Sequence, residues 1–356
     1  MRPLVKPGLA HAWRDEHTVQ VGVDPDNAVV VTDLEPGARA FLASLTGQVE
    51  VDDLLSRADR DGWDRPSALA LLRVLDDAGV LDDADADVSA LRTLSTAERD
   101  RLQPDLAARS LLGTGHGSGT EALRRRRAAT VRIGGAGRVG AGIALLLAAA
   151  GIGHLVVRDD DKLVEPADVS PGGLRPVDVG RPRAAALRDL AKSVAPTAAV
   201  RTRGPASPDL VVLADERDTD RAETIGLVRD GVPHLVVAVR EAAGVVGPFV
   251  LPGSTACLNC LDLHRTDVDP AWPAVLSQAQ GAPRSIACDV GLASMVAGLA
   301  VLHVLAWLEG ALPPSIDGTL SVALPSGRVR RRSWTPHRGC GCTWESVTTP
   351  VGPTVR

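Results

Sequence analysis

The hydrophobic and polar positions at the start of the chain predict a small domain of strands and helices. Thr18–Val23 alternates apolar with polar residues, and Ala28–Thr32 is rich in β-branched valine. Because turn-forming Asp, Pro and Asn residues separate these two segments, the pattern predicts a β-hairpin. Three apolar-periodic segments follow and predict short helices: Ala38–Leu45, Val51–Ala58, and a third that Ser67 caps and Gly79 ends. A hairpin followed by three helices is typical of a winged-helix-like domain, which we expect over residues 1–86.

A change of composition separates this segment from the rest of the chain. Asp82–Asp87 is acidic and has no large apolar residue, and Leu111–Gly119 is rich in glycine. These features predict a linker over residues 87–129. Arg124–Arg127 is a run of four arginines, which we interpret as a solvated face rather than as a phosphate or nucleic-acid site.

From Thr130 onward, short apolar strands alternate with helices. The predicted strands are Thr130–Ile133, His154–Val157, Asp209–Ala214 and His234–Val239. Strands that are separated by helices usually pair in parallel, with helices covering both faces of the sheet. Residues 130–356 are therefore expected to form an α/β domain with a Rossmann-like, mostly parallel sheet.

One apolar segment is long enough to cross a membrane. Val290–Leu308 contains no Asp, Glu, Lys or Arg. It also carries two glycines, a serine and a histidine, and it lies between Asp289 and Glu309, so we interpret it as a buried core helix. The N-terminal segment has no apolar stretch typical of a signal peptide, so we expect a cytoplasmic protein without a membrane partner.

Charge and composition exclude some functions. The net charge is −5 and aromatic residues make up 2% of the chain. A general nucleic-acid binder has a basic excess, and a single-strand binder has aromatic stacking platforms, so we expect no nucleic-acid partner. The basic residues are almost all arginine, since Lys6, Lys162 and Lys192 are the lysines of the chain.

A glycine-rich loop follows the strand at Thr130–Ile133. Gly135, Gly137 and Gly140 have the GxGxxG spacing, which permits a tight turn and presents backbone N–H groups at a helix N-terminus to phosphate. Asp159 ends the next strand, about 20 residues further on, where an acidic side chain meets ribose hydroxyls. The set predicts a nucleotide-binding ancestry, and the alternative is a glycine-lined packing contact with an empty pocket.

Two close pairs of cysteines predict a structural zinc site. A CxxC pair and a CxC pair can offer four sulfurs to one tetrahedral Zn²⁺, and the metal would then fasten the C-terminal segment to the sheet. The four residues are Cys257, Cys260, Cys340 and Cys342. A disulfide is the alternative, although no secretion signal supports an oxidising compartment; redox chemistry is less favoured, and His337 could replace one cysteine. We interpret Cys288 as a buried small residue rather than a nucleophile.

Together these features resemble the ThiF-type, ubiquitin-activating-like adenylyltransferases over about Thr130–Thr343. The similar segments are GGAGRVGAGIALLLAAAGIGHLVVRDDD, VDVGRPRAAALRDL, CLNC, ACDVGLASMVAGLAVLHVLAWLEG and CGC. The resemblance implies a protein that uses ATP to adenylate the C-terminal carboxylate of a small protein or peptide, usually as a homodimer.

The resemblance also implies roles for individual residues. It makes Asp159 the ribose-binding acid and Asp161 a second acid of the site. It makes Arg183 the cation that contacts phosphate, and either Asp215 or Glu216 the acid that binds magnesium. The family's Asn and its Arg–Gln pair are missing from LVEPADVSPGG, where Ala167 or Asp168 stands near the Asn position. Since this chemistry depends on positioned charges and polar groups, and several of them are missing, we expect no adenylation. If the protein were nevertheless an active enzyme, its cofactors would be ATP and Mg²⁺.

Residues 18–82 resemble, in pattern, the PqqD-like element that recognises leader peptides. A leader adds there as an extra strand to an exposed sheet edge, which assigns peptide binding to Val29, Val30, Val31 and Thr32. The combination resembles the leader-peptide-binding proteins of azoline biosynthesis, which serve a YcaO-type cyclodehydratase. We expect a non-catalytic scaffold that presents a precursor peptide to such an enzyme. The alternatives are an active adenylyltransferase and an orphan protein-interaction module.

Overall fold

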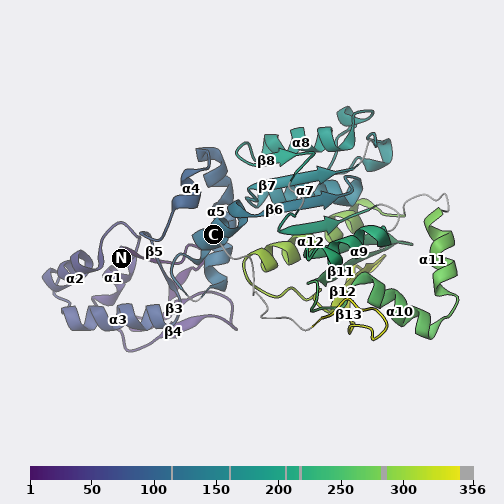
Figure 1. Ribbon diagram of the computed structural model, residues 1–356. Helices are drawn as coiled ribbons and strands as arrows, with labels where there is room; N and C mark the ends of the chain where they lie inside the picture. Colours follow the sequence, from purple (N-terminus) through teal and green to yellow (C-terminus); the bar gives the residue numbers. More distant parts are fainter. Residues whose placement is uncertain (114, 160–161, 205–206, 216–218, 282–286, 345–356) are drawn as a thin grey trace. The chain divides into compact units, whose positions relative to one another are not determined.

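The computed structural model describes residues 1–113, 115–159, 162–204, 207–215, 219–281 and 287–344. The chain divides into two compact units, Met1–Arg124 and Arg125–Arg356. Each unit has its own hydrophobic core, and each is described by itself below (Figure 1).

A three-stranded antiparallel sheet opens the first unit. Its strands, in the order β2-β3-β4, are His11–Trp13, Val19–Val21 and Val29–Val31. Val19 pairs with Val31 and Gln20 with Val30, which confirms the predicted hairpin. A second antiparallel pair of strands, β1 (Pro3–Val5) and β5 (Leu81–Asp83), joins the start of the chain to a segment in the middle of the unit; the sequence pattern did not predict it, because neither segment lies in a longer run of alternating residues.

Three helices complete the core of the first unit, as the apolar spacing predicts. They are α1 (Ala38–Ser44), α2 (Val51–Arg60) and α3 (Arg65–Asp77). The expected cap of α3 was wrong by three residues. Asp64 is the N-cap, and its carboxylate accepts a hydrogen bond from the Ser67 backbone N–H at 3.0 Å. Pro66 then lies in the first helical turn, where a residue needs no N–H, so the helix can begin before Ser67.

The segment expected to be a linker, residues 87–129, is largely helical. It contains α4 (Ser89–Arg92), α5 (Thr96–Leu112) and α6 (Ser118–Ala128). Ser95 and Glu98 form a capping box at the start of α5, a signature that favours helix nucleation. The linker interpretation overlooked this box and the leucines that pack between the helices, among them Leu102 and Leu123.

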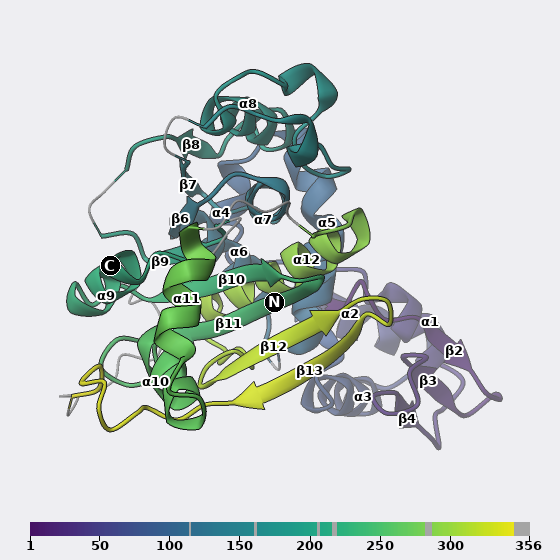
Figure 2. The same ribbon diagram turned by 90° about the vertical axis from the view of Figure 1, so that its right-hand side faces the viewer.

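The second unit is built on an eight-stranded sheet (Figure 2). The strand order is β13-β12-β11-β10-β9-β6-β7-β8. The strands are β6 (Thr130–Gly134), β7 (His154–Arg158), β8 (Ala199–Arg201), β9 (Leu210–Leu213), β10 (His234–Arg240), β11 (Ala243–Val250), β12 (Gly318–Ala323) and β13 (Arg328–Ser333). Strands β6 to β10 run parallel, which confirms the predicted α/β class. The antiparallel strands β11 to β13 extend the sheet beyond what the alternation of strands and helices predicted.

Helices cover both faces of this sheet. Apolar side chains of α7 (Arg138–Ala149), α8 (Arg183–Val194) and α12 (Val290–Leu308) share one core with inward-facing strand residues. Helices α9 (Arg221–Arg229) and α10 (Leu258–Val268) contribute to two other apolar clusters. The strand residues in these clusters alternate with the strand residues of the first core, so they face the opposite side of the sheet. Helix α11 (Trp272–Gly281) follows α10. The central parallel strands are therefore buried on both sides, which explains their continuous apolar sequence.

Helix α12 is the long apolar segment of the sequence. By length and composition alone it could cross a membrane, and 56% of its most apolar stretch is buried in the structure. A Cβ atom added to Gly142 of α7 would lie 3.2 Å from the Ala297 Cβ, so these two helices pack closely. The interpretation of α12 as a core helix is therefore supported by its packing.

The arginine run is not a solvated face throughout. Arg126 is 2% exposed; its Nε donates to Glu309 Oε1 at 2.7 Å, and another guanidinium N–H donates to the Ala150 carbonyl at 2.9 Å. The buried guanidinium thus holds the end of α6 against the ends of α7 and α12. A run of like charges hides this role in the sequence, because the partners lie far along the chain.

Candidate functional site

The glycine-rich loop folds as the tight turn that its spacing predicts. Gly135 has a φ of +83°, and a Cβ atom there would lie 2.5 Å from the Ala214 carbonyl oxygen. A Cβ atom at Gly140 would lie 2.0 Å from the Gly135 carbonyl oxygen. Any larger residue would therefore push the loop apart. Gly137 is the N-cap of α7 and makes no side-chain cap, so the loop brings backbone N–H groups of the first helical turn to the end of β6.

Three charged side chains form a buried network beside this loop. Arg183 is 3% exposed and binds Asp168 through two hydrogen bonds of 2.8 and 2.7 Å. A further guanidinium N–H donates to Asp159 Oδ2 at 3.3 Å, and the Ala136 backbone N–H donates to the same oxygen at 2.9 Å. Lys162 Nζ lies 3.4 Å from the other Asp159 oxygen.

This network places two of the predicted site residues in internal contacts. Arg183, expected to meet a phosphate, bonds both Asp168 and Asp159, the residue expected to meet a ribose. A bidentate arginine–carboxylate pair in a buried place is strong and geometrically fixed. Asp161, a second expected acid, and Glu216, one of two candidates for magnesium binding, lie outside the described residues.

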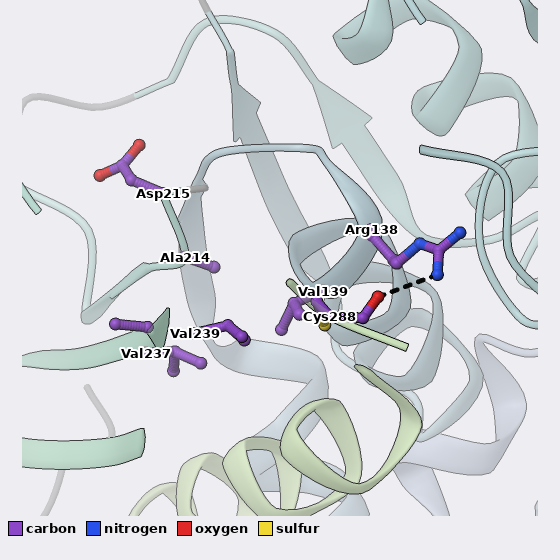
Figure 3. Close-up of a pocket in the computed structure, with 8 residues that line it drawn as sticks. Arg138, Val139, Ala214, Asp215, Val237, Val239 and Cys288 are labelled. Carbon is purple, nitrogen blue, oxygen red and sulfur yellow. Dashed lines mark hydrogen bonds between the residues drawn. The ribbon is translucent and has the colours of Figure 1, made fainter. Parts of the chain in front are cut away.

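A small cavity, partly open to solvent, lies at the carboxyl ends of β9 and β10, beside the start of α7 (Figure 3). Crevices at this edge of a parallel sheet are the usual ligand sites of α/β folds. The residues that line it are Arg138, Val139, Ala214, Asp215, Val237, Ala238, Val239 and Cys288. Most of this lining is apolar, and the charged groups at its rim are Arg138 and Asp215.

Arg138 is a residue that sequence reasoning missed. Its guanidinium donates to the Cys288 carbonyl at 3.0 Å, as Figure 3 shows, and to the carbonyls of Ala167 at 3.0 Å and Val169 at 3.2 Å. It thereby ties the glycine-rich loop to two distant segments. The glycine motif accepts any residue at this position. The positive charge of the arginine in GAGRVG is therefore the only sign of this role in the sequence.

Burial raises the pKa of two ionisable groups that line the cavity. Desolvation, with Glu223 nearby, raises the pKa of Asp215 to about 6. Burial also raises the pKa of the Cys288 thiol, which is 8% exposed and packs within the main core. A thiol with a raised pKa is a poor nucleophile, in agreement with the interpretation of Cys288 as a buried small residue.

The four predicted cysteines meet in space. Cys257 is the N-cap of α10 and Cys260 lies in its first turn, while Cys340 and Cys342 come from the loop after β13. The sulfur atoms of Cys257 and Cys340 are 3.5 Å apart, those of Cys260 and Cys342 are 3.3 Å apart, and those of Cys257 and Cys260 are 3.9 Å apart. All four are free thiols, so the structure does not contain the alternative disulfide.

The cluster fits a tetrahedral metal ion. Metal–sulfur bonds of about 2.3 Å place the four sulfurs of such a centre about 3.8 Å apart, close to the separations seen here. The side-chain amide of Asn259 donates to Cys340 Sγ at 3.2 Å, and the His337 backbone N–H donates to Cys260 Sγ at 3.3 Å. Hydrogen bonds of this kind stabilise thiolates and orient them toward a metal. The four cysteines could therefore hold a metal ion.

Hydrogen bonding within the cluster also favours a thiolate. The Cys257 thiol donates to Cys260 Sγ, and this contact lowers the pKa of Cys260. The same contact and burial raise the pKa of Cys257. One sulfur is thus ready to bind a cation, and binding would release the protons of the others.

His337 is not needed as a metal ligand, because the four cysteines complete the set. Its ring Nδ1 accepts from the Gly339 backbone N–H at 3.0 Å, and its Nε2 lies 2.9 Å from Asp267 Oδ2. His264 lies beside it, with the ring centroids 4.8 Å apart. His264, Asp267 and His337 are close enough to suggest a second cation site, but both nitrogens of His337 already have partners, so we interpret this group as a clamp on the C-terminal loop.

The predicted peptide-binding strand β4 lies at the edge of its sheet. No strand of the described residues pairs with its outer side. Val30 is 41% exposed, whereas Val29 and Val31 pack against the core of the first unit. Thr32 follows the strand and is exposed. The strand therefore offers an open backbone and one exposed apolar side chain.

Comparison with known proteins identifies the class. A model of the ThiF family matches residues 114–343, which is more than half of the chain, so this chain belongs to the ThiF family. This result confirms the resemblance found in the sequence. Protein HesA of Nostoc sp. (strain PCC 7120) is 25% identical over 236 residues, which cover 62% of this chain and 87% of HesA.

Solved structures share the fold across nearly the whole chain. Escherichia coli MccB with AMPCPP and MccA has a TM-score of 0.71 at 15% identity and covers 97% of this chain and 100% of its own. The microcin C7 biosynthetic enzyme MccB in complex with N-formylated MccA has a TM-score of 0.68 at 14% identity, covering 96% and 99%. PaaA has a TM-score of 0.67 at 19% identity, covering 93% and 99%. At these identities the likeness concerns the fold.

Proposed function

We propose that this protein is a non-catalytic member of the ThiF family that binds the leader of a ribosomally made precursor peptide and presents it to a modifying enzyme. The open edge of β4 is the observation that carries the proposal. An extended peptide that adds to such an edge gains main-chain hydrogen bonds, while alternate side chains supply specificity. The first unit then acts as a PqqD-like recognition element, with Val29, Val30, Val31 and Thr32 as the docking strand.

The second unit supports a silent role through its charged network. Arg183 is the residue that the family resemblance assigns to phosphate, and here it is enclosed by Asp168 and Asp159. To reach a phosphate it would have to leave two carboxylates in a buried place, which costs several kcal/mol. The missing Asn and Arg–Gln pair of the family removes further polar donors. A chain with this network keeps the fold and gives up efficient adenylation.

The remaining parts of the proposal concern partners and cofactor. The modifying enzyme is a YcaO-type cyclodehydratase of azoline biosynthesis, and the complex works in the cytoplasm with this chain as a homodimer. The metal in the cysteine cluster is structural zinc, since four thiolates in a closed tetrahedral set are typical of such sites. One protein of similar fold is the microcin C7 biosynthetic enzyme MccB, solved in complex with N-formylated MccA. This similarity supports a role of the present chain in peptide biosynthesis.

A peptide titration tests the proposal. A fluorescently labelled leader, taken from a short precursor gene beside this one, is titrated against the full chain and against a chain that lacks residues 1–86. We expect saturable binding to the full chain only. Equal binding by both proteins would contradict recognition by the first unit.

Two single variants localise the contact to β4. Val30→Asp puts a charge on the exposed edge strand, and Val23→Asp makes the same change at a turn residue that is 77% exposed. Because one cross-strand pair contributes up to about 1 kcal/mol, Val30→Asp is expected to weaken binding by up to roughly fivefold. Val23→Asp is expected to bind as the unchanged chain does, and an equal loss in both variants would show a general charge effect.

An active adenylyltransferase is the second candidate. The cavity beside the glycine-rich loop favours it, since Gly135, Gly137 and Gly140 keep the backbone geometry that receives phosphate. In this case Asp159 would hold the ribose, while Asp161 or Asp215 would bind Mg²⁺. Peptide-dependent exchange of pyrophosphate into ATP decides between the two candidates. Robust exchange that Asp159→Ala abolishes would establish the enzyme and refute the silent scaffold.

A further inference from the structure

The outer strand β13 is an edge of unusual charge. It pairs with β12 on one side, and no strand of the described residues pairs with its other side. Its sequence is RVRRRS, and all six residues are exposed. An exposed edge strand presents backbone N–H and C=O groups that can pair with another extended chain. Four arginines in six residues contrast with a chain whose net charge is −5.

Three of these arginines lie on one face of the strand. Side chains alternate along a strand, so Arg328, Arg330 and Arg332 share a face. Each is separated from the next by two residues, or about 6.8 Å along the strand. They are opposite Ala323, Ser321 and Thr319 of β12, respectively, which carry no charge. No carboxylate among the residues that the structure describes forms an ion pair with any of the three arginines.

Neighbouring contacts hold the strand in place. Arg331, on the other face, donates through Nε to the Pro314 carbonyl at 2.8 Å and through a second N–H to the Ile316 carbonyl at 3.2 Å. The Arg332 guanidinium lies 4.1 Å from the centroid of the buried Trp334 ring. Arg331 thus anchors the strand, while Arg328 and Arg330 extend into solvent from a fixed backbone.

We propose that β13 is a docking edge for an extended acidic segment of a partner protein. In an added strand, carboxylates at every second residue would lie opposite Arg328, Arg330 and Arg332 at the same spacing. The backbone edge supplies hydrogen bonds and the arginines select for negative charge. This surface is separate from β4, so its test does not depend on leader binding.

Labelled peptides test the docking edge on the full chain. One short peptide alternates glutamate with threonine, a second has lysine in place of glutamate, and a third has the first composition with the glutamates grouped. We measure their affinities by fluorescence anisotropy at low and moderate salt. The alternating acidic peptide is expected to bind most tightly. Equal affinity for the lysine peptide, or no binding of the alternating acidic peptide, would overturn the proposal.

Matched variants localise the binding. Arg328→Ser/Arg330→Ser is expected to weaken binding of the acidic peptide by about five- to tenfold, because two exposed ion pairs are lost. Arg201→Ser/Arg203→Ser removes two exposed arginines at and beside β8, the opposite edge of the same sheet, and is expected to have no effect. If both variants weaken binding equally, general charge attraction explains it and the docking edge is refuted.

A modified peptide tests strand addition itself. N-methylation at alternate residues removes the amide donors from one side of the acidic peptide and leaves its charge unchanged. We expect methylation on one set of alternate residues to abolish binding, because an added strand needs those donors. If binding is unchanged when each set is methylated in turn, pairing along the edge is refuted. Aggregation of Arg328→Ser/Arg330→Ser without any acidic-peptide binding by the unchanged chain would instead show that the arginines only protect the edge.

Discussion

Removing the Asp168 carboxylate should destabilise the second unit, because Arg183 would lose its main partner. Both side chains are almost fully buried, and the pair is joined by hydrogen bonds of 2.8 and 2.7 Å. Truncation of one partner of a buried ion pair costs about 3–5 kcal/mol. We expect the lower end for Asp168→Ala, since Asp159 still lies 3.3 Å from the Arg183 guanidinium.

Calorimetry on the metal-loaded protein measures this loss. For a unit of this size each 1 kcal/mol moves Tm by about 2–4 °C, so Asp168→Ala should lower Tm by roughly 6–12 °C. Asp168→Asn keeps an acceptor of the same shape and should lose less. Asp189→Ala removes a carboxylate from the exposed partners Arg181 and Arg188, and the loss should stay within about 1 kcal/mol.

The same result tests the proposal that the protein does not catalyse adenylation. If Asp168→Ala melts as the unchanged protein does, Asp168 does not hold Arg183, and the guanidinium is available to a phosphate. The structural reason for poor adenylation would then fail. A large loss of Tm together with unchanged, negligible pyrophosphate exchange would support the network as a structural element.

Three further predictions concern other buried groups. Metal analysis should find about one ion per chain, lost in Cys257→Ser/Cys340→Ser and retained in Cys288→Ser; full occupancy in the double variant would refute the site. Burial raises the pKa of Asp215 to about 6, so the folded state binds its proton more tightly than the unfolded state and loses stability as pH rises from about 4 to 6. Asp215→Asn should therefore be more stable than the unchanged chain at pH 7.5, by about 1–2 kcal/mol after solvent screening, and no more stable near pH 4, as denaturant melts can check. Arg126→Ala should cost about 3–5 kcal/mol in the same melts, because it removes a buried guanidinium that bonds the Glu309 carboxylate and the Ala150 carbonyl, and a loss below 1 kcal/mol would contradict the buried anchor.

Local patterns in the sequence determined much of the fold. The hairpin at β3 and β4, the parallel strands β6, β7, β9 and β10, and the core helix α12 all follow from the spacing of apolar residues, whereas the short edge strand β8 was not predicted. The glycine spacing predicts the loop at Gly135–Gly140, because a Cβ atom at Gly140 would meet the Gly135 carbonyl within the same short stretch of chain. The two cysteine pairs predicted a four-sulfur cluster, since few other roles require four thiols in that arrangement.

Tertiary structure alone decided the state of the charged residues. Arg183, Asp159 and Asp168 read as a degenerate ligand site in the sequence, and folding joins them into one buried network. Arg126 looked like part of a solvated run, although its partner Glu309 lies far along the chain. A sequence records that a residue is charged, whereas its partners and its burial depend on which distant segments meet it. The same holds for the open edges at β4 and β13, because only the order of strands in a sheet shows which strand lacks a neighbour.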